Sequence, residues 1–160
     1  MNEKDIDRCL KMILRELPYI PGEKKKKTPP HLPPPETAVG DLNFQNHLQY
    51  QLGIRLHESG YYWEAHEAWE SLWQIQDRND SNREFLKALI QITAACLKRK
   101  CDGFSPALRL MNSAESILKK LFPSNQIRFG ISLKHVLDEI EKWKIDSSQI
   151  ALILIPRNRI

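Results

Sequence analysis

Residues able to do chemistry are concentrated between Gly60 and Trp73, where ionisable side chains recur at helical spacing. His66 and Glu70 lie one helical turn apart, so they could share a proton or hold one ligand. His66 and Glu67 begin the zinc-protease motif His-Glu-x-x-His, but Glu70 replaces its second histidine. A catalytic zinc site needs about three protein ligands, and no other histidine has a matching partner. We therefore predict no metal site and no cofactor.

His66 could serve the structure alone. Its spacing places it on the apolar stripe of the helix, so we expect its side chain to face the interior. A buried imidazole needs partners, and Glu70 and Gln91 could provide them. A buried Glu70 would in turn need a cation, for which Arg83 is the best candidate. On this interpretation the residues form a closed polar network in the core.

The same residues could instead form a binding pocket. The pocket would have an aromatic wall of Tyr62, Trp69 and Trp73, with His66, Glu70 and Arg83 as its polar groups. Glutamates at positions 64 and 67 are expected to point toward solvent. The sequence assigns no catalytic residue. The candidate site residues are Glu64, His66, Glu67, Trp69, Glu70, Trp73, Arg83 and Gln91.

The elements that would position these side chains are all predicted to be helices. The bundle helices are expected to begin at Asp41, near Gly60, at Ser81, at Ser105 and at Ser132. Short links force the first two and the next two into antiparallel hairpins, and the last helix closes a compact bundle of about five core helices. Apolar residues cover more than one face of the helix after Ser81, so we expect it to be central.

The ends of the chain are expected to be appendages of this bundle. An amphipathic helix over 5–17 ends before Pro18, and we expect it to cover an apolar patch of its own chain or of a second copy. The apolar tail is expected to lie extended over the bundle or to pair with a second chain. The divisions are an N-terminal helical arm (1–17), a Pro/Lys-rich linker (18–40), the helical bundle domain (41–144) and an apolar tail (145–160).

Composition and charge exclude several classes of protein. The net charge of +4 equals the charge of the lysine run Lys24–Lys27, so the rest of the chain is formally neutral and nucleic-acid binding is not expected. No apolar run approaches the roughly 20 residues that span a bilayer, and the first residues lack the features of a secretory signal. We therefore expect a cytoplasmic protein that does not enter the membrane. The cysteines, Cys9, Cys96 and Cys101, are expected to be reduced thiols.

Three stretches of the chain resemble one known family. They are Gly60–Trp73, then Arg83–Gln91, then Gly103 with Ala107 and Leu110, and they are similar to the bacterial domain-of-unknown-function family numbered 309. The resemblance covers residues 42–125 and implies a compact helical domain with no established activity. Its recurrent polar positions correspond to Glu64, His66, Glu67, Glu70, Arg83 and Gln91.

Two positions depart from the family pattern. Lys87-Ala88 stand where the family usually has Gln-Gly, and Lys98 stands where it often has a histidine. A site completed by that histidine in relatives would be altered here.

We therefore predict a binding or protein-interaction module with a buried cluster of His66, Glu70 and Arg83. The alternative is an enzyme that binds a metal or a small molecule through the same residues. Expected partners are a second copy of the chain, a protein of unknown identity or a small molecule.

Overall fold

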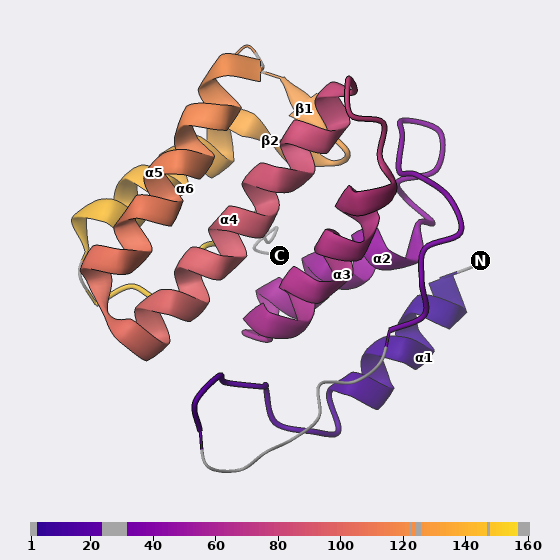
Figure 1. Ribbon diagram of the computed structural model, residues 1–160, viewed down its shortest axis with the longest axis horizontal. Helices are drawn as coiled ribbons and strands as arrows, with labels where there is room; N and C mark the ends of the chain where they lie inside the picture. Colours follow the sequence, from indigo (N-terminus) through magenta and orange to yellow (C-terminus); the bar gives the residue numbers. More distant parts are fainter. Residues whose placement is uncertain (1–2, 24–31, 122, 124–125, 147, 157–160) are drawn as a thin grey trace.

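The fold is a bundle of helices with one short β-hairpin (Figure 1). The computed structural model describes residues 3–23, 32–121, 123, 126–146 and 148–156. In chain order its elements are α1 (Glu3–Ile13), α2 (Leu48–Glu58), α3 (Tyr62–Ile75), α4 (Ser81–Asp102), α5 (Phe104–Leu121), β1 (Ile127–Arg128), β2 (Ile131–Ser132) and α6 (Leu133–Ile145). The prediction of an all-α bundle is confirmed.

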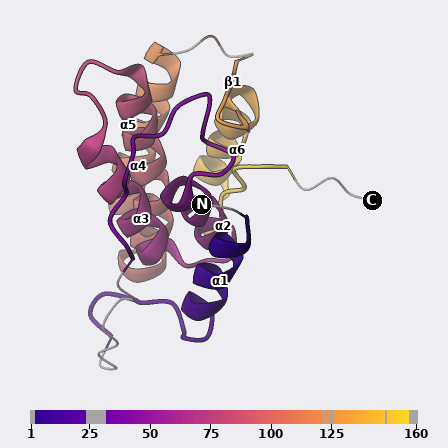
Figure 2. The ribbon, with the colours of Figure 1, turned by 90° about the vertical axis from the view of Figure 1, so that its right-hand side faces the viewer.

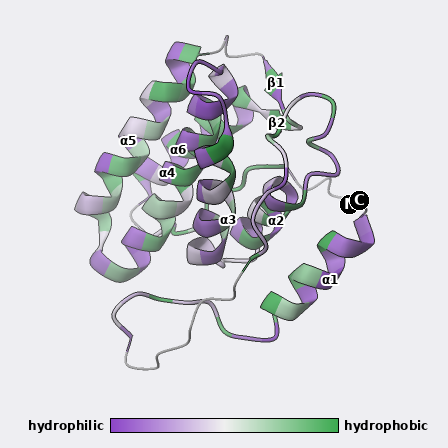
Figure 3. Cartoon of the chain, turned by 45° about the vertical axis from the view of Figure 1, so that its right-hand side comes forward, coloured by the Kyte–Doolittle hydropathy of each residue, from purple (hydrophilic) through white to green (hydrophobic). Residues whose placement is uncertain are grey.

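The helices lie in two layers. Figure 2 shows α3, α4 and α5 side by side in one layer and α1, α2 and α6 in the other. The core between them includes Tyr50, Trp69, Phe85 and Trp143, all of which are 0% exposed. Hydrophobic and hydrophilic residues alternate along each helix in Figure 3, as expected of helices that bury one face. Removing that apolar surface from water stabilises the bundle by roughly 25 cal/mol per Å².

Glycines and polar caps end the helices close to the expected positions. Gly60 follows α2 with a φ of 82°, and Gly103 separates α4 from α5 with a φ of 90°, a conformation that glycine adopts without steric cost. Asp80 caps α4 by accepting a hydrogen bond from the backbone of Asn82, one residue before the expected cap. Ser132 caps α6, as predicted.

Helix α2 begins later than the sequence predicted. Residues 41–46 form hydrogen-bonded turns, and α2 starts at Leu48 and not at Asp41. The reason lies in Asn43, whose side chain accepts a hydrogen bond from Gly40 N and donates one to Ala38 O. Such local side-chain bonds compete with the helical hydrogen bonds of the backbone.

Helices α2 and α3 approach closely at Gly53. A Cβ atom added there would lie 2.0 Å from Trp69 Nε1. The same Nε1 donates a hydrogen bond to Tyr50 O at 3.3 Å. Only a residue without a side chain lets the indole of Trp69 pack this closely against α2.

The β1–β2 hairpin was not predicted from the sequence. Its strands pair Ile127 with Ser132 and Arg128 with Ile131. Phe129, with a φ of 47°, is buried in the turn, and its carbonyl accepts a hydrogen bond from Tyr50 Oη at 2.7 Å. Two-residue strands carry almost no periodic signal, so the sequence pattern could not reveal them.

Both ends of the described chain pack on the bundle. Helix α1 buries Ile6 and Ile13, and Arg55 of α2 forms an ion pair with Asp7 of α1. The tail runs over the bundle without forming a strand and buries Leu152 and Leu154. Part of the proposed linker, residues 24–31, lies outside the described residues, and the domain divisions stay predictions. Among the described helices, none combines the length and apolarity needed to cross a membrane.

Candidate functional site

A groove of about 830 Å³ lies between α3, α4 and α5, and we call it the α4 groove. A turn of the segment that follows α1 lies against the same groove. The lining residues are Pro21 and Gly22 from this turn, Trp63 and His66 from α3, Gln91, Ala94, Leu97, Lys98, Cys101 and Asp102 from α4, and Pro106, Arg109, Leu110 and Ser113 from α5.

Helical spacing explains why these side chains meet. Gln91, Ala94 and Lys98 recur at intervals of three and four residues and therefore share one face of α4. Ile92 and Cys96, which are 0% exposed, lie on the opposite face and pack in the core. The α4 groove is thus the outer face of the central helix, with α3 and α5 as its two walls.

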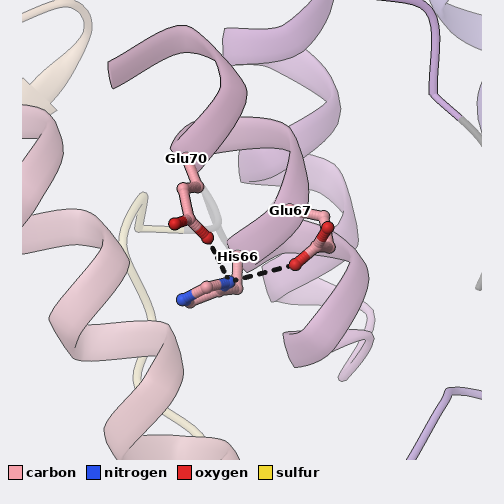
Figure 4. Close-up of side chains that lie close together, drawn as sticks. All are labelled: His66, Glu67 and Glu70. Carbon is pink, nitrogen blue, oxygen red and sulfur yellow. Dashed lines mark ion pairs between the residues drawn. The ribbon is translucent and has the colours of Figure 1, made fainter. Parts of the chain in front are cut away.

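His66 lies at the edge of this groove with its ring held near two carboxylates. Its Nδ1 lies 3.4 Å from Glu70 Oε2 and 3.6 Å from Glu67 Oε1. Neither contact is aligned as a hydrogen bond, so Nδ1 is buried without a hydrogen-bond partner. Figure 4 shows the second ring nitrogen pointing away from both carboxylates, toward the neighbouring helices. Attraction between such partly exposed groups is worth under about 1 kcal/mol and requires a protonated ring.

The same three side chains could offer donor atoms to a metal ion. One nitrogen of His66 and one oxygen each of Glu67 and Glu70 lie within 4.8 Å of one another. Zinc binds such ligands at about 2.0–2.2 Å, so two ligands of one ion are at most about 4.4 Å apart. The side chains would have to move slightly to close on an ion, and all the donors come from a single helix.

Aromatic rings form one wall of the α4 groove. The ring of Trp63 stacks on His66 with centroids 6.1 Å apart and meets Tyr19 with centroids 5.0 Å apart. Its indole Nε1 is buried without a hydrogen-bond partner, and so is Gln91 Oε1 on α4. A buried polar atom left unpaired costs about 1–3 kcal/mol. Two residues that line the groove therefore have polar atoms whose hydrogen bonds the described part of the protein does not complete.

Charged residues cluster at one end of the groove. Lys98 pairs with Asp102 at 3.0 Å, one turn further along α4. Arg109 faces the same end from α5 and forms no ion pair with another described residue.

The structure corrects the predicted position of Glu64. Its side chain is 3% exposed and does not face solvent. Glu64 Oε1 accepts a hydrogen bond from Tyr19 N at 2.8 Å. Burial raises the pKa of the Glu64 carboxyl, and the hydrogen bond from Tyr19 opposes this effect. The segment after α1 therefore covers a position that the helical pattern alone places outside.

The expected aromatic wall of the pocket is also wrong. Tyr62 and Trp69 are buried in the core and do not line the groove, where Trp63 lies instead. Trp73 is covered by Arg83, whose guanidinium lies 4.0 Å from the ring centroid.

Arg83 does not pair with Glu70 in the structure. Its Nη1 donates hydrogen bonds to Trp73 O at 2.9 Å and to Gln76 O at 3.0 Å, where α3 ends. The predicted network of His66, Glu70 and Arg83 is therefore not formed as expected. Of the predicted site residues, His66 and Gln91 meet in the α4 groove, with Glu67 and Glu70 beside His66.

The histidine that is satisfied in the core is His57, which sequence analysis missed. Its Nε2 donates to Leu152 O at 2.7 Å, and its Nδ1 lies 3.0 Å from Thr93 Oγ1. A carbonyl can only accept, so Nε2 carries the proton and Nδ1 accepts from the hydroxyl. Burial lowers the pKa of His57 to about 4, and the hydrogen bond to Leu152 opposes this effect. The spacing of Tyr50, Ile54 and His57 on one face of α2 could have revealed its burial.

Other groove residues were missed because they lie on α5. Pro106, Arg109 and Ser113 share one face of that helix at intervals of three and four residues. This face is polar enough to pass for a solvent-exposed one. Only its position opposite Gln91 and Lys98 shows that it borders a groove.

Comparison with known proteins gives one match. A family model described as "Domain of unknown function (DUF309)" matches residues 50–110. The match runs from α2 into α5 and confirms the family resemblance predicted from the sequence. No curated protein and no solved structure matches the chain.

Proposed function

We propose that the α4 groove, most of whose lining lies in the stretch that matches the DUF309 family model, is the binding site for a small organic molecule. One observation carries the proposal. Trp63 and Gln91, from two different helices, both line this groove, and each has a buried side-chain polar atom without a hydrogen-bond partner. Unpaired polar atoms destabilise a fold, and a bound partner can offset that cost.

The size and lining of the groove support a small ligand. Its volume of about 830 Å³ falls within the roughly 300–1,000 Å³ typical of small-molecule sites. Ala94, Leu97 and Leu110 offer apolar contacts along the groove. An apolar surface with a few convergent polar groups is the usual composition of such a site.

His66 and Gln91 would orient the ligand. The carboxylates of Glu67 and Glu70 attract the Nδ1 side of the His66 ring, which leaves the other ring nitrogen for the groove (Figure 4). Gln91 Oε1 can only accept, so it favours a ligand with a hydrogen-bond donor. Small side-chain rotations would bring these atoms to the groove surface.

The test uses N-phenyl-1-naphthylamine, a neutral fluorescent probe with an apolar body and one N–H donor. We expect one probe molecule to bind per chain. Ala94→Trp, which fills the middle of the groove, should abolish binding, whereas Ala151→Trp on the exposed tail should not. Equal binding by the two variants, with both folded by circular dichroism, would contradict the proposal.

Zinc distinguishes this role of the carboxylates from metal binding. If Glu67 and Glu70 only attract the His66 ring, zinc at micromolar concentration should leave the melting temperature unchanged. An increase that Glu70→Gln removes would instead make the carboxylates metal ligands. His66 would then be assigned to the ion and not to the organic ligand.

Two other expectations from the sequence stay proposals. One is a cytoplasmic location. The other is self-association, which exposed apolar residues such as Leu17 after α1 and Ile153 in the tail would support. Native mass spectrometry of the full chain would report the number of subunits.

A further inference from the structure

We propose that the ligand of the α4 groove is an organic anion, whose acidic group is held by Arg109 and Lys98 at the end of the groove near the C-terminus of α4. This inference rests on the proposed binding function. It adds the chemical class of the ligand and the direction in which it lies.

The topology brings the two cations together. Helices α4 and α5 form an antiparallel hairpin through Gly103, so Lys98 on one helix lies level with Arg109 on the other. Both line the groove. Asp102 neutralises Lys98 through its 3.0 Å ion pair, whereas Arg109 has no ion pair within the described chain. Glu23 and Lys100, which line an adjoining hollow beside Cys101 and Asp102, add one charge of each sign, so one positive charge remains in excess at this end.

The helix dipoles do not decide the charge of this end. The C-terminus of α4 carries a partial negative charge and the N-terminus of α5 a partial positive one, and the two ends adjoin. Their effects oppose each other. The charged side chains at this end, which are Lys98, Asp102 and Arg109 together with Glu23 and Lys100, therefore set the local potential.

The opposite end of the groove is unsuitable for an anion. There Glu67 and Glu70 lie beside His66, and Gln91 presents a carbonyl oxygen. Gln91 and Lys98 are separated by about 10 Å along α4, at about 1.5 Å per residue. A fitting ligand would place its acidic group near Arg109, its apolar body over Ala94 and a donor near Gln91.

A turn of the chain strengthens the attraction at the cationic end. Pro21 and Gly22 lie against the groove there, next to Cys101 and Asp102. They displace water from one side of the site, and charge attraction grows as the local dielectric constant falls.

The experiment compares two probes that differ by one acidic group. 8-Anilinonaphthalene-1-sulfonate has the rings and the N–H of N-phenyl-1-naphthylamine plus a sulfonate. Fluorescence titration of the full chain should give tighter binding of the sulfonate by about fivefold. Arg109→Gln should remove that advantage, so that the two probes bind with about equal affinity. Arg78→Gln, in the loop before α4, is the matched control.

Asp102→Asn should change the affinity for the sulfonate probe in the opposite direction. Removing its carboxylate frees Lys98, so the sulfonate should bind about threefold to fivefold more tightly. Because this dye also binds partly unfolded chains, the variant must keep the circular dichroism spectrum of the parent protein and bind the neutral probe as the parent does. Equal affinities of the two probes, unchanged by Arg109→Gln and Asp102→Asn, would overturn the anion assignment and leave the groove as a neutral site. Failure of both probes to bind in the groove would overturn the proposed function itself.

Discussion

Two histidine regions of the bundle differ in whether the protein completes their hydrogen bonds. Around His57, every ring nitrogen has a partner, from α4 and from the tail. Around His66, the ring faces two carboxylates without an aligned hydrogen bond, and its neighbours Trp63 and Gln91 also carry unpaired atoms. A polar group that the fold itself satisfies needs nothing further to explain it. A group left unsatisfied beside a groove supports the proposal of a partner outside the chain.

The two regions should differ most in how much stability is lost when their histidine is replaced by alanine. His57→Ala removes two buried hydrogen bonds, leaves the Leu152 carbonyl short of a partner and leaves the Thr93 hydroxyl with only its longer bond to Tyr62 O at 3.4 Å. It should lower the free energy of unfolding by about 3–4 kcal/mol. His66→Ala removes a partly exposed ring and should cost under about 1 kcal/mol.

Urea denaturation of both variants, followed by circular dichroism, measures these values. His66→Ala should also weaken the neutral probe while the protein stays folded. If His66→Ala proved as destabilising as His57→Ala, the two regions would share a structural role and the comparison would fail.

Gly53 tests how tightly the His57 region is packed. The ring of Trp69 lies 6.1 Å from that of His57, and a Cβ atom on Gly53 would meet this indole at 2.0 Å. Alanine normally stabilises a helix relative to glycine by about 1 kcal/mol. Here Gly53→Ala should instead destabilise the protein by about 2–3 kcal/mol, because neither the backbone nor the buried indole can move freely.

Gly40→Ala is the control for that substitution, since a Cβ atom there would meet nothing within 4 Å. Its melting temperature should stay close to that of the parent protein. A stabilised Gly53→Ala variant would show that α2 and α3 are less closely packed than the structure describes.

Acid should reduce the stability that the neutral His57 side chain contributes to the fold. The pKa of His57 is lowered from 6.5 to about 4 by burial, so the folded protein disfavours the proton that the unfolded chain accepts. The stability from neutral His57 is complete above pH 6.5 and is lost as pH falls toward 4. The loss should be about 2 kcal/mol between pH 7 and pH 5.

Protonation of a second buried group, Glu64, changes the stability in the opposite direction. Because the pKa of Glu64 is raised by burial, its protonation in acid relieves a cost and stabilises the fold. The His57 contribution is therefore read as the difference between the parent protein and His57→Gln across the pH range. Parallel stability curves for the two proteins would show that His57 does not contribute.

The fold was predictable because helical periodicity is local. Apolar residues at intervals of three and four placed the bundle helices, and Gly60 and Ser132 marked helix ends. His66 and Gln91 were singled out for the same reason. The pattern could not show which edge of α3 borders a groove, since His66 lies between the apolar stripe and the polar face.

The features that the sequence did not predict depend on contacts between distant segments of the chain. His57 is satisfied by Leu152, 95 residues away, and Glu64 is covered by Tyr19, 45 residues away. Neither partner belongs to a periodic pattern, because both are backbone groups of irregular segments. The assignment of a satisfied core histidine to His66 failed on this point, and so did the solvent-facing position of Glu64.

The smallest expected effect tests the comparison most directly. Gln91→Met keeps the shape of the side chain and removes the unpaired Oε1 atom, so the protein should become more stable by about 0.5–1 kcal/mol. The matched change is Gln76→Met, because Gln76 is 4% exposed and its amide bonds both Val39 N and Val39 O. There the same substitution should cost about 2 kcal/mol.

Thermal unfolding gives both values, and probe titration should show weaker binding only for Gln91→Met. A gain in stability together with a loss of binding is the behaviour of a residue kept for a ligand, whereas a loss of stability would return Gln91 to the structural side of the comparison.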